Sequence, residues 1–329
     1  KRSRYQERRK LDRVIDIPET GARIRRGVGL SYFFHGAGFT GNGEAYLKGK
    51  VALELVPGGQ VLIKTASTDI DQGTVTIFPQ IAGDTLGISP QKIIMVPPDT
   101  SQVPDSGPTV ASRTTMVVGK VVMEAAREIK EKIDAFKPGQ PFSQSTDAYL
   151  KEVGPLRVDA TFQSPPDIEW NADTYQGDAY PCYGWAADMV EVEVDLDTAE
   201  VRITEFVTAH DAGKVIHPVL AEGQVEGGSL QALAWACMEE VVLKNGRMWN
   251  DRMTNYIIPT SLDAPEMDVD LVEAPYEYGP FGAKGIGEMP MDGGVPAVFA
   301  AIEHALGIPL PDVCPLMPER LIQVIEESS

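Results

Sequence analysis

Apolar residues recur at every fourth position along residues 112–136, SRTTMVVGKVVMEAAREIKEKIDAF. This spacing keeps side chains on one face of an α-helix, and polar residues fill most of the other positions. The pattern therefore predicts a long helix with one buried face, formed by Val117, Val121, Ala125, Ile129 and Ile133.

Other patterns surround this helix in the first half of the chain. Residues 51–67 alternate around a Pro57-Gly58-Gly59 turn and predict a hairpin. Residues 71–88 predict a helix that stops at Gly87, and residues 92–98 predict a short strand. Near the N-terminus, residues 3–16 (SRYQERRKLDRVID) predict a short exposed helix that ends before Pro18.

The second half begins with a strand-rich section over residues 177–213, with a turn at Asp197-Thr198. Helical patterns follow at residues 217–242, 295–307 and 317–327. Prolines cluster between residues 138 and 166, which indicates a boundary near 138–165. We expect an α+β fold of two related subdomains, each with a mixed sheet and packed helices. The expected division is a basic N-terminal helix or arm (1–26), a first subdomain (27–150) and a second subdomain (151–329).

Charge is unevenly distributed along the 329 residues. The net charge is −19, which argues against nucleic-acid binding. Residues 1–26 hold ten Lys/Arg and four Asp/Glu, a net of +6, so the remainder carries −25. The basic arm is interpreted either as a solvated surface segment or as a docking element for an acidic partner. No apolar stretch has the length and composition of a membrane span, and no leader pattern indicates secretion, so we expect a cytoplasmic protein.

The three cysteines, Cys182, Cys237 and Cys314, lie 55 and 77 residues apart. Iron–sulfur clusters need grouped thiolates, and structural zinc sites need similarly close ligands. The spacing predicts no cluster held by this chain, and buried free thiols in a reducing compartment instead.

Glycine, serine and threonine gather where four helices are expected to begin, at 71–74 (DQGT), 111–115 (ASRTT), 223–229 (GQVEGGS) and 291–294 (MDGG). Helix N-termini present unpaired N–H groups and a partial positive charge. These residues are also ordinary helix starters, so each motif alone has a simple structural explanation. Four together favour a large phosphorylated ligand, although none fits the GxxxxGK[ST] pattern of a nucleotide loop.

The last of these motifs belongs to a longer glycine-rich segment, GAKGIGEMPMDGG over residues 282–294, which holds one glutamate, Glu288. Glycines allow close backbone approach, and a partly buried carboxylate is a good general base. The alternative is an ordinary surface-loop acid.

These segments together resemble the molybdenum hydroxylases, the xanthine dehydrogenase and aldehyde oxidoreductase family. GAKGIGE is similar to the family's glycine loop and terminal glutamate, and residues 211–233 resemble its Gly-Gln-x-Glu-Gly-Gly segment. Residues 68–88 and 104–115 resemble two further cofactor-contacting segments. The family's molybdenum-binding portion is much longer, so the resemblance implies the C-terminal half of a split molybdopterin-binding subunit.

The resemblance also implies roles for single residues. Glu288 matches the catalytic base, and Phe39 and Thr40 match a pair beside the substrate, where an aromatic ring can stack on a flat heterocycle. Molybdenum is expected to be held by the pterin dithiolene, with no protein side chain as ligand. Val110 and Arg113 depart from some relatives, which have Ala and a neutral residue there. The positions that match cofactor contacts are Gln72, Gly73, Ala111, Ser112, Arg113, Thr114, Thr115, Gln224, Gly285 and Gly287.

The implied activity is hydroxylation of an aromatic N-heterocycle with oxygen from water, with nicotinate converted to 6-hydroxynicotinate. The implied cofactor is molybdopterin cytosine dinucleotide with molybdenum and a terminal sulfur or selenium. The implied partners are a large molybdopterin subunit, an iron–sulfur subunit and an FAD subunit that passes electrons to NADP, with [2Fe-2S] clusters and FAD on those partners. Alternatives are an aldehyde or purine (xanthine) hydroxylase subunit and a non-catalytic scaffold or cofactor-insertion partner.

Overall fold

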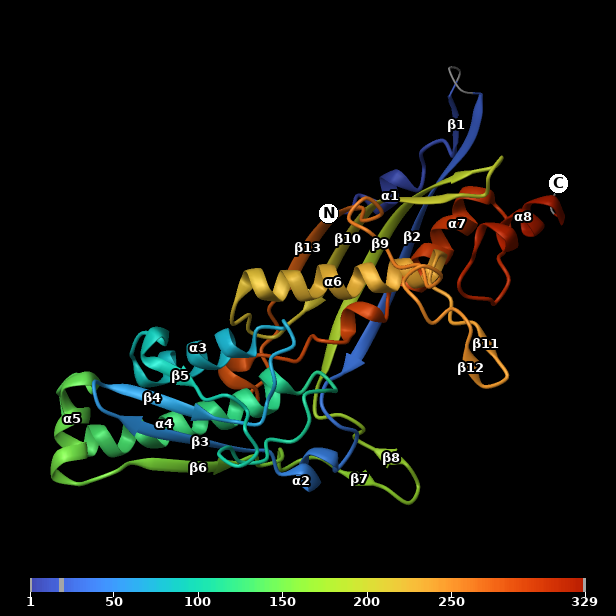
Figure 1. The fold of residues 1–329 in the computed structure, drawn as a ribbon. Coiled ribbons are helices and arrows are strands. Elements are labelled where there is room, and N and C mark those ends of the chain that lie inside the picture. The colour runs from blue at the N-terminus through green and yellow to red at the C-terminus, as the bar shows by residue number, and fades with distance from the viewer. Residues whose placement is uncertain (1, 18–20, 328–329) are drawn as a thin grey trace.

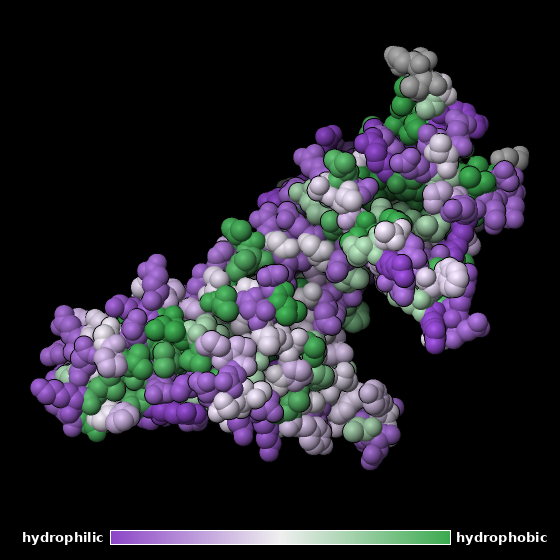
Figure 2. Space-filling view, viewed as in Figure 1, coloured by the Kyte–Doolittle hydropathy of each residue, from purple (hydrophilic) through white to green (hydrophobic). Residues whose placement is uncertain are grey.

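Two separate sheets, each covered by its own helices, give the chain an elongated two-lobed shape (Figure 1). The computed structural model describes residues 2–17 and 21–327. In the space-filling view a wide notch separates the β11–β12 hairpin from the β7–β8 hairpin at one side (Figure 2). The predicted α+β class is confirmed.

The first lobe is built on a four-stranded sheet in the order β5-β4-β3-β6. The predicted hairpin is confirmed as β3 and β4, with Leu53 opposite Ile63. The strands are β3 (Lys50–Val56), β4 (Gln60–Lys64), β5 (Ile93–Met95) and β6 (Arg157–Thr161). The helices of this lobe are α2 (Gly43–Leu47), α3 (Thr74–Leu86), α4 (Gly119–Phe136) and α5 (Phe142–Glu152), with a 3₁₀ turn η1 at Pro90–Lys92.

The long amphipathic helix is confirmed as α4, and Val121, Ala125, Ile129 and Ile133 of its predicted apolar face lie in the core of the first lobe. Val117 precedes α4 and is buried in a separate small cluster. The first turn of the predicted helix differs from the prediction, because Thr114–Val118 form a π-helical turn, η2. Such turns are rare and are frequent at functional sites. The helix α3 also agrees with the prediction and ends at Gly87, which has the left-handed conformation of a C-cap (φ 71°).

The second lobe is built on a five-stranded sheet in the order β1-β2-β9-β10-β13, antiparallel except for the parallel pair β10–β13. Its strands are β1 (Val14–Ile17), β2 (Ala22–Gly36), β9 (Tyr183–Asp195), β10 (Val201–Asp211) and β13 (Glu266–Val272). Its helices are α6 (Pro218–Cys237), α7 (Gly294–Leu306) and α8 (Pro318–Glu327), with the short turns η3 (Pro280–Gly282) and η4 (Met289–Met291). Two small hairpins complete the chain, β7 (Trp170–Asn171) with β8 (Gln176–Gly177) and β11 (Leu243–Lys244) with β12 (Arg247–Met248).

Helix α7 lies directly on β2 because two glycines leave room for its backbone. A Cβ atom at Gly27 would lie 1.9 Å from the Ala301 carbonyl oxygen, and one at Gly29 would lie 2.0 Å from that of Ala297. The second core forms between this sheet and α6, α7 and α8, apart from the core of the first lobe.

The predicted helix over residues 3–16 is wrong beyond Arg8. The helix α1 (Tyr5–Arg8) is one turn long, and the chain then forms β1, whose β-branched valine and isoleucines favour a strand and which pairs antiparallel with β2. Pro18 lies outside the described residues.

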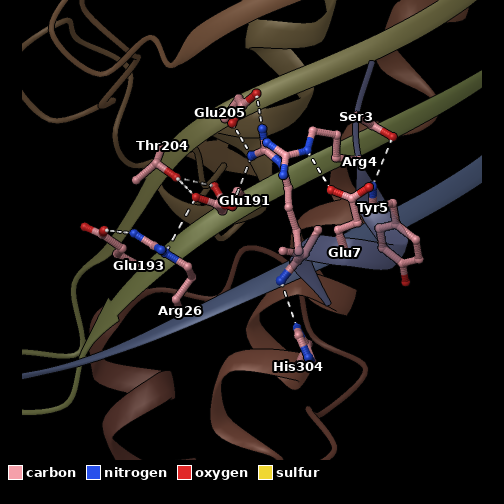
Figure 3. Close-up of polar contacts among 12 residues, drawn as sticks. Ser3, Arg4, Tyr5, Glu7, Arg26, Glu191, Glu193, Thr204, Glu205 and His304 are labelled. Carbon is pink, nitrogen blue, oxygen red and sulfur yellow. Dashed lines mark hydrogen bonds and ion pairs between the residues drawn. The ribbon is translucent and has the colours of Figure 1, made fainter. Parts of the chain in front are cut away.

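The basic N-terminal residues pair with acids of the second lobe's own sheet (Figure 3). The Arg8 guanidinium binds Glu205 and Glu191, and Arg26 lies 3.5 Å from Glu193. Arg2 lies 3.2 Å from Asp268 on β13. These pairs favour a segment fixed on its own sheet over a free docking arm.

Several elements have no counterpart in the sequence prediction. The strand β2 crosses residues 26 and 27, where a division was expected, and pairs with β9 along its length. The expected boundary region 138–165 contains α5 and β6, and Phe142 and Val158 from these elements belong to the first core. Proline density there marks the ends of these elements, since Pro141 directly precedes α5. The division into three parts remains a prediction.

Candidate functional site

A cavity of about 320 Å³ lies where the two lobes meet. The first lobe contributes residues 70–77 and 109–115 to its lining, and the second lobe contributes residues 212–224 and 283–288. Four of the glycine-rich or hydroxyl-rich motifs noted in the sequence (71–74, 111–115, 223–229 and 282–294) therefore contribute to one space.

Glu288 lies at this cavity and is held by Ser112. The Ser112 hydroxyl donates to Glu288 Oε2 at 3.0 Å and accepts from the Glu288 backbone N–H at 3.0 Å. The Glu288 side chain is 56% exposed, so the partial burial expected for it is absent in this chain alone. Its second carboxylate oxygen, Oε1, makes no hydrogen bond with the described part of the chain.

The backbone around Ser112 is strained. Ala111 (φ 55°) and Ser112 (φ 53°) are consecutive non-glycine residues in the left-handed region. Each such residue costs about 1 kcal/mol or more, and such strain gathers at functional sites. Gly285 lies against this turn, because a Cβ there would be 1.7 Å from the Ser112 carbonyl oxygen.

The cavity wall is rich in unused hydrogen-bond donors. Within the described chain, no acceptor engages the backbone N–H groups of Ala111, Ser112, Gly285, Ile286 and Gly287. The hydroxyls of Thr114 and Thr115 and the carboxamide of Gln224 likewise make no hydrogen bond to described residues. This donor set suits an acceptor-rich ligand such as a phosphorylated cofactor.

Most predicted cofactor contacts line this cavity, namely Gln72, Ala111, Ser112, Thr114, Thr115, Gln224, Gly285 and Gly287. The Gln72 side-chain amide donates within its own loop, to the Thr68 carbonyl and to the Thr74 hydroxyl. Gly73 caps α3 beside the cavity, in the left-handed conformation (φ 89°).

Arg113, at a position predicted to contact the cofactor, does not line the cavity. Its side chain is fully buried and binds Glu44, with Nε 2.9 Å from Oε1 and Nη2 2.9 Å from Oε2. Its Nη1 donates to the carbonyls of Ser106 and Pro108. Every end of the guanidinium is therefore occupied inside the first lobe.

Phe39 and Thr40 are not among the residues that line the cavity containing Glu288. Phe39 lines a second, smaller cavity of about 90 Å³ together with Tyr276 and Tyr278. The Thr40 hydroxyl donates to that of Tyr180 at 3.0 Å. In this chain the structure thus does not bring the predicted substrate pair to the cavity that contains Glu288.

Of the two remaining predicted helix starts, the one at residues 223–229 is wrong and the one at residues 291–294 is confirmed. Residues 223–229 lie in the interior of α6, which begins at Pro218 after the N-cap His217, so their amides are used within the helix. Residues 291–294 do lead into α7, with Gly293 as N-cap.

Polar residues of β2 and β9 contact the C-terminal end of the Glu288 loop. The Ser31 hydroxyl donates to the Gly293 carbonyl at 2.8 Å. Asp188, fully buried, accepts from Thr208 at 2.5 Å, lies 3.5 Å from His210 and packs against Gly293. A Cβ at Gly293 would come within 2.4 Å of Asp188, so the loop depends on glycine here.

Sequence reasoning missed two further groups beside Glu288. Lys284 donates to Asp211 at 2.6 Å and to the Tyr183 carbonyl, which ties the loop to the ends of β9 and β10. His35, at the end of β2, lies 2.8 Å from Asp292 and 3.8 Å from Glu288. The lysine within the glycine loop was a usable signal, whereas no local pattern marks His35.

A family model described as a molybdopterin cofactor-binding domain matches residues 1–265. The molybdenum-binding subunit of xanthine dehydrogenase from Escherichia coli O157:H7 is 26% identical over 318 residues, covering 91% of this chain and 42% of that protein. The gamma subunit of the 6-hydroxypseudooxynicotine dehydrogenase complex of Paenarthrobacter nicotinovorans is 28% identical over 292 residues, covering 82% of this chain and 36% of that subunit. The crystal structure of quinoline 2-oxidoreductase from Pseudomonas putida 86 superposes with a TM-score of 0.79 at 26% identity, covering 92% and 42%. The chain thus spans about two fifths of the length of these relatives.

Proposed function

The chain belongs to the molybdopterin cofactor-binding domain family shared by xanthine dehydrogenases, aldehyde oxidoreductases and CO dehydrogenases, and from this premise we propose that it is a subunit of a molybdenum-dependent hydroxylase. One observation carries the proposal: Glu288 is fixed by Ser112 at a cavity whose other walls present unpaired N–H and hydroxyl donors. Glu288 is the general base of the proposed reaction.

The residues present fit the cofactor. The amides of residues 111–112 and 285–287 and the side chains of Thr114, Thr115 and Gln224 would hold its phosphate and pterin acceptors. When bound, the molybdenum cofactor supplies oxygen transfer to the substrate and accepts two electrons. The form we propose is molybdopterin cytosine dinucleotide, with a terminal sulfur or selenium on the metal.

The task of Glu288 is to remove one proton as the attacking oxygen forms its bond to the ring carbon. Ser112 donates to one lone pair of Oε2, which leaves the other lone pairs of the carboxylate, including one on Oε2, to accept that proton. The fixed carboxylate saves the entropy of positioning a mobile base.

The proposed substrate is an aromatic N-heterocycle, with nicotinate hydroxylated to 6-hydroxynicotinate. The motif order resembles that of the molybdopterin subunits of bacterial nicotinate dehydrogenase, and relatives named for quinoline and 6-hydroxypseudooxynicotine support this substrate class. Relatives named xanthine dehydrogenase and aldehyde oxidoreductase make a purine or aldehyde the second candidate.

The remaining parts of the enzyme are proposed to lie on other polypeptides. A large molybdopterin subunit would complete the cofactor site, and iron–sulfur and FAD subunits would carry electrons to NADP in the cytoplasm. The three cysteines here are free thiols, but Cys182 and Cys237 are only partly buried and Cys314 is exposed, contrary to the expectation that all are buried. Burial raises the pKa of Cys182 to about 11, which disfavours its thiolate form.

Glu288→Gln in the assembled enzyme tests the proposal. We expect turnover to fall by roughly 10²-fold or more while molybdenum content stays normal. Unchanged turnover with nicotinate, xanthine and aldehydes would instead favour the scaffold alternative. Comparing these three substrates with the wild-type enzyme tests the substrate class separately.

A further inference from the structure

A histidine and two carboxylates form a continuous row beside the cavity. His35 Nδ1 lies 2.8 Å from Asp292 Oδ2, and His35 Nε2 lies 3.8 Å from Glu288 Oε2. The His35 side chain, in the middle of the row, is 21% exposed, whereas Asp292 and Glu288 are 37% and 56% exposed. Residue 35 lies near the end of a strand of the sheet, and residues 288 and 292 flank the turn η4, so the fold brings together groups 257 positions apart.

The contact with Asp292 fixes the tautomer of the ring. An ionised carboxylate can only accept, so Nδ1 carries the proton of the neutral imidazole. The ring then turns the lone pair of Nε2 toward Glu288. An ionised Glu288 also offers only lone pairs, so no hydrogen bond forms, in agreement with the 3.8 Å separation. Once Glu288 holds a proton, an O–H···N hydrogen bond becomes available between these atoms.

We infer that His35 takes up the proton that Glu288 acquires during turnover; this rests on the proposed function of Glu288. The Glu288 O–H bond breaks and a His35 Nε2–H bond forms, which restores the carboxylate and leaves an imidazolium. Asp292 stabilises that cation through Nδ1–H, and the cation then releases its proton to water. His35 acts through Glu288 and is a positioning and relay residue, and Asp292 orients it as a carboxylate orients histidine in other relays.

Other charges near the row are occupied. Lys284 is bound to Asp211, and Lys214 is bound to Glu273 at 2.9 Å. On the paired strand, the residue opposite His35 is Gly184, which carries no charge. Asp292 and Glu288 are therefore the ionised groups that His35 contacts among the described residues.

The test is steady-state kinetics of the assembled enzyme with His35→Ala and His35→Gln. We expect kcat to fall about tenfold or more, with KM and molybdenum content unchanged. Added imidazole should raise kcat of His35→Ala in proportion to its concentration, without effect on the wild type. Asp292→Asn, which removes the charge that stabilises the imidazolium, should lower kcat in the same direction.

His304→Gln is the matched control, since His304 lies at the far end of α7 and bonds the Val28 amide, and its kcat should not respond to imidazole. If Glu288→Gln is inactive while His35→Ala turns over at the wild-type rate, the relay is refuted and the proposed function stands. Loss of activity in His35→Ala without imidazole rescue, with wild-type kcat in Asp292→Asn, also refutes it. If Glu288→Gln retains full activity, the proposed function fails first.

Discussion

Ser112 and Glu288, 176 positions apart, are joined by one hydroxyl that both donates to the carboxylate and accepts from the backbone of the same residue. The serine that makes both contacts has a left-handed backbone conformation, with φ 53°. This double contact fixes both the position and the orientation of the carboxylate.

Ser112→Ala should weaken catalysis without removing the base. A hydrogen bond to a charged group contributes about 1.5–3 kcal/mol, which corresponds to roughly 10- to 150-fold in rate. We expect kcat of the assembled enzyme to fall within that range, less than for Glu288→Gln. Ser101→Ala, in an exposed turn, is the control. Equal kcat values for Ser112→Ala and the wild type would show that the loop alone holds Glu288.

Gly285→Ala and Gly287→Ala should fail in different ways. A Cβ at Gly285 collides with the Ser112 carbonyl, so this variant should lose stability of the loop. A Cβ at Gly287 makes only ordinary contact, 3.6 Å from the Ser112 hydroxyl, but lies at the cavity. Gly287→Ala should therefore keep its melting temperature and bind less molybdenum cofactor. Full cofactor content in a folded Gly287→Ala enzyme would argue that no ligand approaches this loop closely.

Glu44→Gln should destabilise the first lobe. It leaves the guanidinium of Arg113 buried without its counter-charge, which costs roughly 3–5 kcal/mol. Urea unfolding measures this loss. The double variant Glu44→Leu/Arg113→Met should lose much less than the sum of the single changes. Additive losses would mean that the two side chains do not depend on each other.

Because of His304, the free energy of unfolding of the second lobe should decrease in mild acid. Burial, together with the charges of Arg9 and Arg13, lowers the pKa of His304, whose Nδ1 accepts from the Val28 N–H. The unfolded chain therefore binds a proton near pH 6.5 that the folded chain resists, and stability falls as pH drops from 7 toward 5.

His304→Asn keeps an acceptor near the same place and does not titrate. Urea midpoints of the wild type should decline more steeply with falling pH than those of the variant. Parallel declines would show that His304 is not the group responsible. The other three histidines are present in both proteins, so the comparison isolates the substitution at residue 304.

Periodicity predicted the elements whose one face is buried and whose other face is polar, such as α4. It missed β2, because glycines stand on the face that α7 covers and disguise the alternation. It also missed α5, where the flanking prolines were interpreted as a linker. The local hydrophobic pattern does not reveal that a helix packs on a strand when glycines, which have no side chain, provide the space for that helix.

Some features of the candidate site could likewise be predicted from the sequence, and others could not. Glycine-rich and hydroxyl-rich segments correctly indicated a shared cavity, since these residue types leave backbone donors open. The direction of Arg113 was unpredictable, because its partner Glu44 lies 69 positions away. The placement of Phe39 and the contact between His35 and Asp292 likewise depend on pairing across the fold.

Among the described residues, the helices include none with the length and hydropathy of a membrane span.

The two lobes have separate hydrophobic cores. Separate cores allow separate unfolding transitions in the ligand-free chain. The cavity, however, takes its walls from both lobes. A ligand bound there stabilises only molecules in which both lobes are folded, and so couples their unfolding. Cofactor loading would thus merge two melting events into one, which makes cooperativity itself a measure of whether the site is filled.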